Sequence, residues 1–314
     1  MQTKPSRGLV IAAFAAIYLI WGSSYISIHF AIQTLPPFLM TSGRFLGAGS
    51  ILIIWSLLRG APHPTRANWR AAAITGGFMF LLNNTMIVWA EDHDLPSSIT
   101  ALLLATMPMW MVAINWARGS RPTLITVIGL IVGFSGIMLL MNSGNAVPSN
   151  PPHPLAPFAV LLASACWAAG SLYSRGADLP RNAGLSTGMQ LFAGGFMVLI
   201  VSIVTGDAAR FDPAQVSVLS LAAVAYLMIF ASIVGFSAFV WLMRVSTPAK
   251  VATYSYVNPI VAVFLGWLLA QEPITWRTLV AAAVIIASVV MITAYGGRSV
   301  PRFRLRPAKA VESA

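Results

Sequence analysis

Long apolar runs separated by short polar breaks follow one another along the chain. A helix that crosses a bilayer needs roughly 20 predominantly apolar residues. Runs of about this length lie at residues 9–31, 38–58, 70–90, 97–117, 122–141, 156–175, 185–205, 217–242, 249–270 and 276–296. The pattern therefore predicts an all-α integral membrane protein with ten transmembrane helices.

One longer polar break divides these runs into two sets of five. Residues 142–157, "NSGNAVPSNPPHPLAP", are rich in Pro, Asn and Ser. Before the break, "ALLLATMPMWMVAINW" at 101–116 aligns with "ATYSYVNPIVAVFLGW" at 252–267, so that Pro108 matches Pro259 at an offset of 151. We interpret the two sets as an internal repeat. Chance similarity between apolar helices is the alternative.

Tryptophans extend the repeat to other spans. Trp21 and Trp167 are equivalent at an offset of 146, and Trp89 and Trp241 at an offset of 152. Because five spans is an odd number, the second set enters the membrane upside down, as in many secondary transporters. The predicted organisation is two inverted-topology five-helix repeats. The repeats are 9–141 and 156–296, with a linker at 142–155 and a basic tail at 297–314.

Basic residues are distributed unevenly between the breaks. If the N-terminus is cytoplasmic, 16 of the 19 Lys and Arg residues fall on the cytoplasmic side, and only Arg210 and Arg277 fall outside. Cytoplasmic loops of membrane proteins carry an excess of Lys and Arg. Both chain ends are therefore expected in the cytoplasm, where the basic tail would rest on anionic headgroups.

The composition agrees with lipid as the main solvent. The chain is 58% hydrophobic and 9% charged, whereas soluble domains are about 25% charged. The net charge of +11 does not indicate nucleic-acid binding, because the basic residues lie in short breaks rather than in a patch with interleaved aromatic residues. The single cysteine, Cys166, excludes a disulfide framework.

Several short stretches carry a family resemblance. They are "IWGSS" (20–24), "GRFLGAG" (43–49), "MPMWMVAINW" (107–116), "NPIVAVFLGW" (258–267) and "QEPIT" (271–275). With ten spans in two halves, the chain resembles the drug/metabolite transporter superfamily, specifically its EamA-like exporters. The two repeats would then be EamA-like repeats.

The resemblance has consequences for location and architecture. It implies a bacterial inner-membrane exporter of small metabolites, with a central cavity lined by spans one to four and six to nine. Spans five and ten would lie at the periphery. The chain departs from the family pattern at Arg121-Pro122, where the family often has Glu-Pro or Glu-Arg, and this leaves the role of that loop open.

Two prolines interrupt spans four and nine. Because proline has no N–H, Pro108 and Pro259 deprive the carbonyls of Leu104 and Ser255 of their helical donors. Within a membrane, such freed groups are tolerated where they line a cavity. We therefore predict helix breaks with a gating role at both prolines.

Span nine also carries two polar side chains on one face, Tyr254 and Asn258. The amide can both donate to and accept from a polar ligand, and the tyrosine can stack on an apolar one. Asn258 is either a substrate contact or a cap on freed carbonyls of a neighbouring helix.

Span one contains a polar stripe on an otherwise apolar helix. Trp21, Ser24 and Tyr25 share a face, and His29 lies four residues beyond Tyr25. Such a stripe should face the helix bundle rather than lipid. His29 is either a solvated surface residue or a proton-responsive gate, which would make protons the coupling ion.

Arg44 is the charged residue that lies well inside a span. A buried arginine is costly and is usually paired. Arg44 either clamps helix carbonyls or Asn83 and Asn84, or anchors a carboxylate or phosphate of the substrate. Gln190, its repeat equivalent at an offset of 146, also needs a partner. We predict that Arg44, Asn84 and Gln190 bind substrate.

Trp110, Trp167 and Ser171 are predicted to complete an aromatic wall with polar spots around the same site. A separate small-residue face in span five, Gly129, Gly133 and Gly136, suits close helix contact. That contact lies either within the chain or between the protomers of a homodimer.

The predicted function is secondary-active or facilitated export of small amphipathic metabolites, amino acids or drug-like compounds, by alternating access. A channel or a transport-inactive sensor is the alternative. An intramembrane enzyme is disfavoured, because the chain has no HExxH, GxSxG or clustered metal ligands, and no cofactor is predicted. The sequence contains no Walker A motif, so transport driven directly by ATP hydrolysis is disfavoured.

Overall fold

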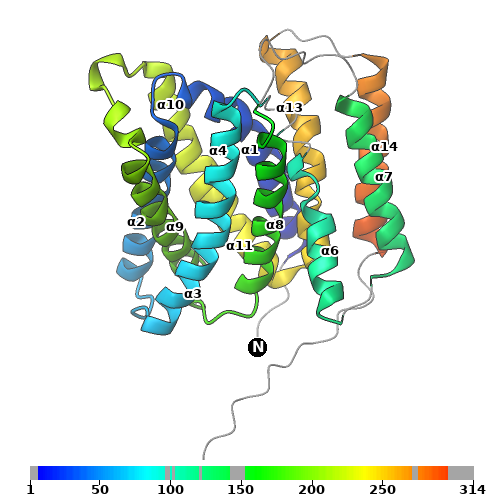
Figure 1. Cartoon of the computed structure of the whole chain (residues 1–314). Helices are drawn as coiled ribbons and strands as arrows, with labels where there is room; N and C mark the ends of the chain where they lie inside the picture. Colours follow the sequence, from blue (N-terminus) through cyan, green and yellow to red (C-terminus); the bar gives the residue numbers. More distant parts are fainter. Residues whose placement is uncertain are drawn as a thin grey trace, which may run out of the picture.

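The computed structural model describes residues 6–95, 100, 103–119, 122–141, 153–270 and 275–295. These residues form a bundle of helices, and none of them lies in a strand (Figure 1). The first part of the chain forms α1 (Arg7–Ile32), α2 (Pro37–Leu58), α3 (Arg66–Gly76), η1 (Gly77–Leu82), α4 (Asn83–Asp92), α6 (Met107–Ala117) and α7 (Leu124–Met141).

The second part of the chain follows a similar order. It forms α8 (Ala156–Ser174), α9 (Ala183–Val204), η2 (Asp207–Arg210), η3 (Pro213–Gln215), α10 (Val218–Tyr226), η4 (Leu227–Gly235), α11 (Phe236–Val245), α12 (Pro248–Ala252), α13 (Tyr254–Ala270) and α14 (Trp276–Tyr295). In both parts, the α-helices are initiated by residues suited to helix starts. Ser6, Thr65, Asn182, Ser217 and Thr247 accept backbone N–H groups there, and α2, α6 and α8 have proline in the first turn.

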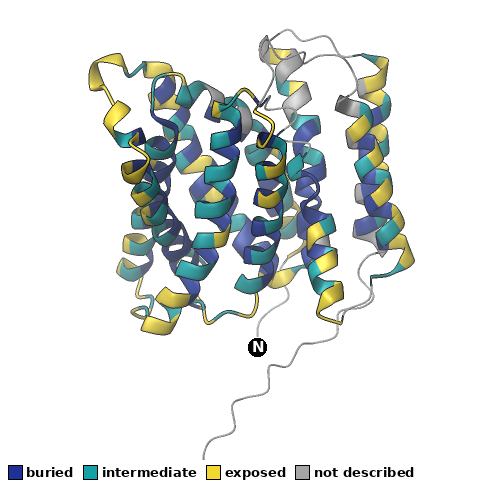
Figure 2. Ribbon diagram, in the orientation of Figure 1, coloured by how far each residue is buried: buried dark blue, intermediate teal, exposed yellow. Residues whose placement is uncertain are grey.

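Six described helices are long and apolar enough to cross a membrane. Their segments are Arg7–Ser24, Pro37–Leu58, Arg66–Asp92, Ala156–Ser174, Ala183–Val204 and Val218–Val245. The other four predicted spans overlap α6, α7, α13 and α14, which are not among these six segments. Large apolar side chains are exposed as well as buried, for example Ile54, Leu162, Phe196 and Phe264. Figure 2 shows exposed residues along the outer helices of the bundle. An apolar outer surface is what lipid requires, so the chain is an all-helical membrane protein.

Two of the long helices contain a wide π-helical segment in their middle. η1 joins α3 to α4, and η4 joins α10 to α11. Shifted by the offset of 152 that relates Trp89 to Trp241, η1 falls at 229–234, inside η4. Wide segments of this kind are rare and often occur at functional sites.

The most extensive contact between the two parts of the chain is between α2 and α9, at the left of Figure 1. A Cβ added to Gly49 would lie 2.6 Å from the backbone nitrogen of Phe192, and one added to Gly188 would lie 2.9 Å from the carbonyl oxygen of Gly49. The two backbones are therefore in direct contact, which only glycine permits.

The glycine face predicted in span five is used within the chain. α7 packs on α14 at the opposite end of the bundle (Figure 1). A Cβ added to Gly133 would clash with the hydroxyl of Ser288, and the Ser288 hydroxyl donates to the carbonyl of Gly129 at 2.7 Å. Of the two alternatives for this face, contact within the chain is therefore the one observed.

Asp207 links the two parts of the chain in another way. Its buried carboxylate accepts the backbone N–H of Leu39 at 2.8 Å and the hydroxyl of Ser202 at 2.9 Å. Leu39 lies in the first turn of α2, whose early N–H groups lack partners within the helix. Asp207 thus caps the start of α2 with a negative charge.

Candidate functional site

A cavity of about 130 Å³ lies in the middle of the bundle, between helices of both parts of the chain. Its apolar lining is Trp21, Ile28, Phe45, Phe80, Ile87, Leu104, Met107, Trp167, Leu191, Ala231, Phe236 and Tyr254. Its polar lining is Ser24, Arg44, Asn83, Asn84, Ser164, Ser232, Ser255 and Asn258. A mainly apolar pocket with a few convergent polar groups is the usual form of a small-molecule site.

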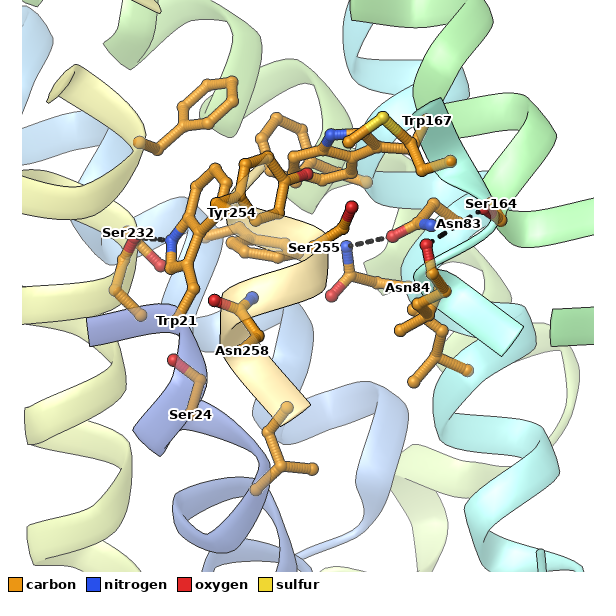
Figure 3. Close-up of a pocket in the computed structure, with 18 of the residues that line it drawn as sticks. Trp21, Ser24, Asn83, Asn84, Ser164, Trp167, Ser232, Tyr254, Ser255 and Asn258 are labelled. Atoms are coloured by element: carbon orange, nitrogen blue, oxygen red, sulfur yellow. Dashed lines mark hydrogen bonds between the residues drawn. The ribbon is translucent and has the colours of Figure 1, made fainter. Parts of the chain in front are cut away.

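One wall of the cavity is aromatic. Trp21 lies with its ring centroid 5.6 Å from that of Trp167 and 4.7 Å from that of Tyr254, in both cases nearly perpendicular. Phe80 and Phe236 continue the wall, with centroids 4.8 Å apart. In Figure 3, the rings of Trp21, Tyr254 and Trp167 lie on one side of the pocket, and the amides of Asn84 and Asn258 lie on the other.

Behind this wall, toward the N-terminal end of α1, the bundle is closed. The hydroxyl of Tyr18 lies 2.7 Å from that of Thr253, at the turn between α12 and α13. Tyr18 also packs against a buried apolar cluster that includes the fully buried Phe239 and Leu242. The cavity-lining residues of α1, Ser24 and Ile28, lie on the other side of Trp21 along the helix.

Arg44 is the charged group of the cavity lining. Its side chain is 6% exposed, one of its terminal nitrogens donates to the Asn84 Oδ1 at 3.5 Å, and its guanidinium carbon lies 4.4 Å from the centroid of the Phe45 ring. Its Nε is buried and has no hydrogen-bond partner. The predicted clamp onto Asn84 therefore exists as a single hydrogen bond of limiting length.

The two neighbouring asparagines have different contacts. Asn83 donates to the carbonyl of Ala163 at 2.9 Å and so ties α4 to α8. Asn84 donates to the carbonyl of Met79 at 3.1 Å, within η1, and more weakly to the Asn83 Oδ1 at 3.4 Å. Asn83 is a structural bridge, whereas Asn84 holds the wide segment and presents its oxygen to Arg44.

Several buried polar atoms of the lining have no partner. They are Arg44 Nε, Trp167 Nε1, Ser232 Oγ and Asn258 Oδ1. Most buried polar groups in proteins are hydrogen-bonded, and leaving one unpaired costs about 1–3 kcal/mol. Four of the nine such atoms in the described part of the chain line this cavity, so a polar ligand bound there could complete their hydrogen bonding.

The helix breaks differ from the prediction. Pro108 lies in the first turn of α6, where no helical N–H is needed, and the freed carbonyl of Leu104 accepts the Ser164 hydroxyl at 3.3 Å. Pro259 lies inside α13, and the interruption occurs earlier, at Thr253. The predicted break at Pro259 is therefore misplaced by about a turn and a half.

Most of the predicted site residues meet in this cavity. Those that line it are Trp21, Ser24, Arg44, Asn84, Trp167, Tyr254 and Asn258. The side chains of Tyr25 and His29 lie outside the described part of the structure. The remaining predictions, Trp110, Ser171 and Gln190, lie elsewhere.

Local packing explains those three exceptions. Trp110 is 38% exposed on α6. Ser171 donates back to the carbonyl of Trp167 at 2.7 Å within α8. Gln190 is fully buried where α9 meets α3, and its amide nitrogen donates to the carbonyl of Ser186 at 3.0 Å. None of the three reaches the cavity.

Sequence reasoning missed several lining residues: Phe45, Phe80, Ser164, Ser232, Phe236 and Ser255. An isolated phenylalanine or serine in an apolar run gives no signal that separates a cavity-facing residue from a buried one. Repeat equivalence provides one signal, since Phe80 and Ser232 are related by the offset of 152.

The comparisons with known proteins agree with this architecture. The sequence profile of the EamA-like transporter family matches residues 7–142 and 154–294. The uncharacterized inner membrane transporter YedA of Escherichia coli (strain K12) is 34% identical over 285 residues, which cover 90% of each chain. Protein PecM of Dickeya dadantii (strain 3937) is 26% identical over 283 residues, covering 87% of this chain and 88% of the relative.

A solved crystal structure has a similar fold. It superposes with a TM-score of 0.74 at 19% sequence identity and covers 93% of this chain and 98% of the other. At this identity, the likeness concerns the fold alone.

Proposed function

The chain belongs to the EamA-like transporter family, and we propose that it exports small amphipathic metabolites, amino acids or drug-like compounds, by alternating access. Its relative YedA is named as an uncharacterized inner membrane transporter, and the chain is a membrane protein of the same family. Beyond family membership, we propose export as the direction of transport, small amphipathic metabolites as the substrates, and either secondary-active or facilitated transport as the mechanism. The proposed architecture is ten spans in two inverted five-helix repeats, 9–141 and 156–296.

The helix contacts support the inverted repeat. A two-fold axis that exchanged the parts would exchange α1 with α8, α2 with α9 and α7 with α14. It would therefore convert the contact of α6 with α8 into that of α13 with α1, the contact of α4 with α8 into that of α11 with α1, and the contact of α3 with α8 into that of α10 with α1. All of these contacts occur, and α2 with α9 and α7 with α14 are the most extensive.

The observation that carries the proposal is the composition of the cavity lining. Repeat-equivalent residues line it in pairs: Trp21 and Trp167, Phe45 and Leu191, Phe80 and Ser232, Asn84 and Phe236, Leu104 and Ser255, and Met107 and Asn258. A cavity built in this way lies near the pseudo-two-fold axis, where inverted-repeat transporters bind substrate.

We further propose that both chain ends are cytoplasmic. The closed side, marked by Tyr18 and Thr253, is then the cytoplasmic side. Alternating access would open this contact and close the opposite face of the cavity.

We also propose that protons are the coupling ion, with His29 as a candidate gate, and that the protein assembles as a homodimer. For His29→Gln, an unchanged pH dependence of transport would end the idea of a histidine gate.

Flux measurements on the purified protein test the function. Liposomes containing the protein are loaded with labelled amino acids or amphipathic drugs, with and without an imposed pH gradient. Saturable flux above that of protein-free liposomes supports transport, and a dependence on the gradient supports proton coupling. Flux that does not saturate favours a channel, no flux of any compound favours a sensor, and chemical conversion of the compound favours an enzyme.

A further inference from the structure

We infer that the cavity selects organic anions, with Arg44 binding the carboxylate of a compound whose body is apolar or aromatic. This inference rests on the proposed transport function, because it names the charge class of the transported compound. It separates anions from the zwitterionic amino acids and cationic drugs that the proposed function also includes.

The first observation is that no acidic side chain among the described residues pairs with Arg44. Its described contacts are the amide oxygen of Asn84 at 3.5 Å and the face of the Phe45 ring at 4.4 Å. Both contacts are electrostatically favourable, but neither partner carries a negative charge. A buried charge without a counter-charge is costly, and a bound anion would supply the missing one.

The second observation is the absence of acidic side chains from the described lining of the cavity. A cation would meet Arg44 without any compensating carboxylate. The ammonium group of a zwitterion would find only neutral acceptors, such as the unpaired Oδ1 of Asn258. In a low-dielectric site, the difference between the electrostatic energies of a bound anion and a bound cation beside Arg44 is larger than it would be in water.

The unpaired donors of the lining fit an anion as well. The Nε of Arg44 belongs to a planar guanidinium, which matches a carboxylate with parallel hydrogen bonds. The indole N–H of Trp167 and the hydroxyl of Ser232 are two further groups able to donate that are buried and unpaired. A carboxylate has up to four acceptor sites, so it can accept hydrogen bonds from such donors, whereas an ammonium group has no acceptor site.

The remaining lining fits the body of the ligand. Trp21, Phe80 and Phe236 supply ring faces and edges, and the volume of about 130 Å³ favours a small compound. Aromatic side chains bind flat apolar groups through large contact areas and preferred ring geometries. The preferred ligand is therefore a small carboxylate with an aromatic or similarly compact apolar group.

A matched series of probes tests the charge preference. 3-Phenylpropionate, 3-phenylpropanamide, 3-phenylpropylamine and phenylalanine share one body and carry an anionic, neutral, cationic and zwitterionic head. Their affinities for the purified protein in detergent are measured by quenching of tryptophan fluorescence and by calorimetry. We expect the acid to bind about tenfold more tightly than the amide, and the amine and the amino acid to bind more weakly than the acid.

Two variants assign that preference to Arg44. Arg44→Gln installs the residue found at the equivalent position, Gln190, and should reduce the ratio of acid to amide affinity to about one. Asn84→Asp places a carboxylate beside the guanidinium and should abolish the preference while keeping the arginine. The control is Arg59→Gln, which changes an exposed arginine stacked on Trp55 at the end of the same helix, and its ratio should equal that of the wild type.

The inference is overturned if wild-type protein binds the amine or the amide as tightly as the acid, or if both Arg44→Gln and Asn84→Asp keep the acid preference. Folding is checked by monodispersity and by thermal unfolding, and the ratio of affinities is insensitive to the fraction of active protein. Flux of the same probes separates this result from the proposed function. Acid-selective binding without flux contradicts transport alone, whereas flux without a charge preference contradicts the anion site alone.

Discussion

Trp21 and Trp167 occupy equivalent places in the two parts of the chain, and their rings meet in the cavity wall with centroids 5.6 Å apart at an interplanar angle of 86°. A residue that touches its own repeat equivalent lies close to the axis relating the two. In the proposed inverted repeat, the pair therefore lies near the two-fold axis, where both halves contribute to one wall.

The first prediction concerns this wall. Trp167→Ala removes ring contacts with Trp21, Phe80 and Phe236, each worth about 0.5–1.5 kcal/mol, and removes an unpaired indole N–H. Flux into liposomes should fall by about tenfold or more, with normal membrane insertion. Trp276→Ala is the control, because Trp276 is 76% exposed at the start of α14. Wild-type flux in Trp167→Ala would remove this residue from the site.

The second prediction concerns Asn258. Its Oδ1 is buried and unpaired beside the cavity, so Asn258→Ala should lower substrate affinity by about tenfold, as expected for a lost polar contact. Insertion into the membrane should be unchanged. Asn115→Ala serves as a control, because Asn115 lies on α6 away from the lining. Equal apparent affinities for both variants and the wild type would contradict the prediction.

The third prediction concerns the closed side of the bundle. Tyr18→Phe removes the hydrogen bond to Thr253, worth about 1 kcal/mol, and should shift the access equilibrium about fivefold. The readout is labelling of Ser24→Cys by a membrane-impermeant maleimide in a Cys166→Ala background. Labelling from the side that carries the start of α1 should accelerate. Tyr173→Phe, at the end of α8, should not alter it, and an unchanged rate in Tyr18→Phe would argue against a gate.

The fourth prediction concerns the contact of α2 with α9. Gly49→Ala forces a methyl group into the backbone of Phe192, and overpacking of this kind costs about 1–3 kcal/mol. The midpoint of thermal unfolding in detergent should fall. Gly43→Ala is the matched control in the same helix, because nothing lies within 4 Å of the added Cβ. Equal midpoints for the two variants would show that the helices separate freely.

The fifth prediction concerns the cap on α2. Asp207→Asn weakens the acceptor for the Leu39 N–H and removes the negative charge at the helix start, at a cost of about 1 kcal/mol. Thermal unfolding should shift downward by a few degrees, without a change in ligand selectivity. Asp212→Asn should have a smaller effect, because Asp212 caps only the short, exposed η3. The reverse order would contradict a capping role.

The sequence was most informative where membrane physics restricts the choice of residue. Arg44 and Asn84 stood out because polar groups in an apolar span need partners, and both line the cavity. Trp21 and Trp167 stood out because their spacing repeats. The existence of helices followed from the length of the apolar runs, and six described helices are long and apolar enough to cross a membrane.

The remaining site could not be predicted because the direction of a side chain depends on local helix geometry. η1 and η4 contain wide turns that shift the face presented by the residues around them, and Phe80, Ser232 and Phe236 lie there or next to them. Gln190 shows the limit of repeat equivalence. Its position corresponds to that of Arg44, yet it is buried against α3, since the neighbours of the two helices differ.

The paired lining residues have unlike chemistry. Phe80 corresponds to Ser232, Met107 to Asn258, and Asn84 to Phe236. A ligand in the cavity would therefore meet two dissimilar walls and have one preferred orientation, even though the two proposed repeats are related by a pseudo-two-fold axis. Exchanging the residues of one pair would be expected to turn the bound molecule around before it prevented binding, so the pose of the ligand could be redesigned independently of its affinity.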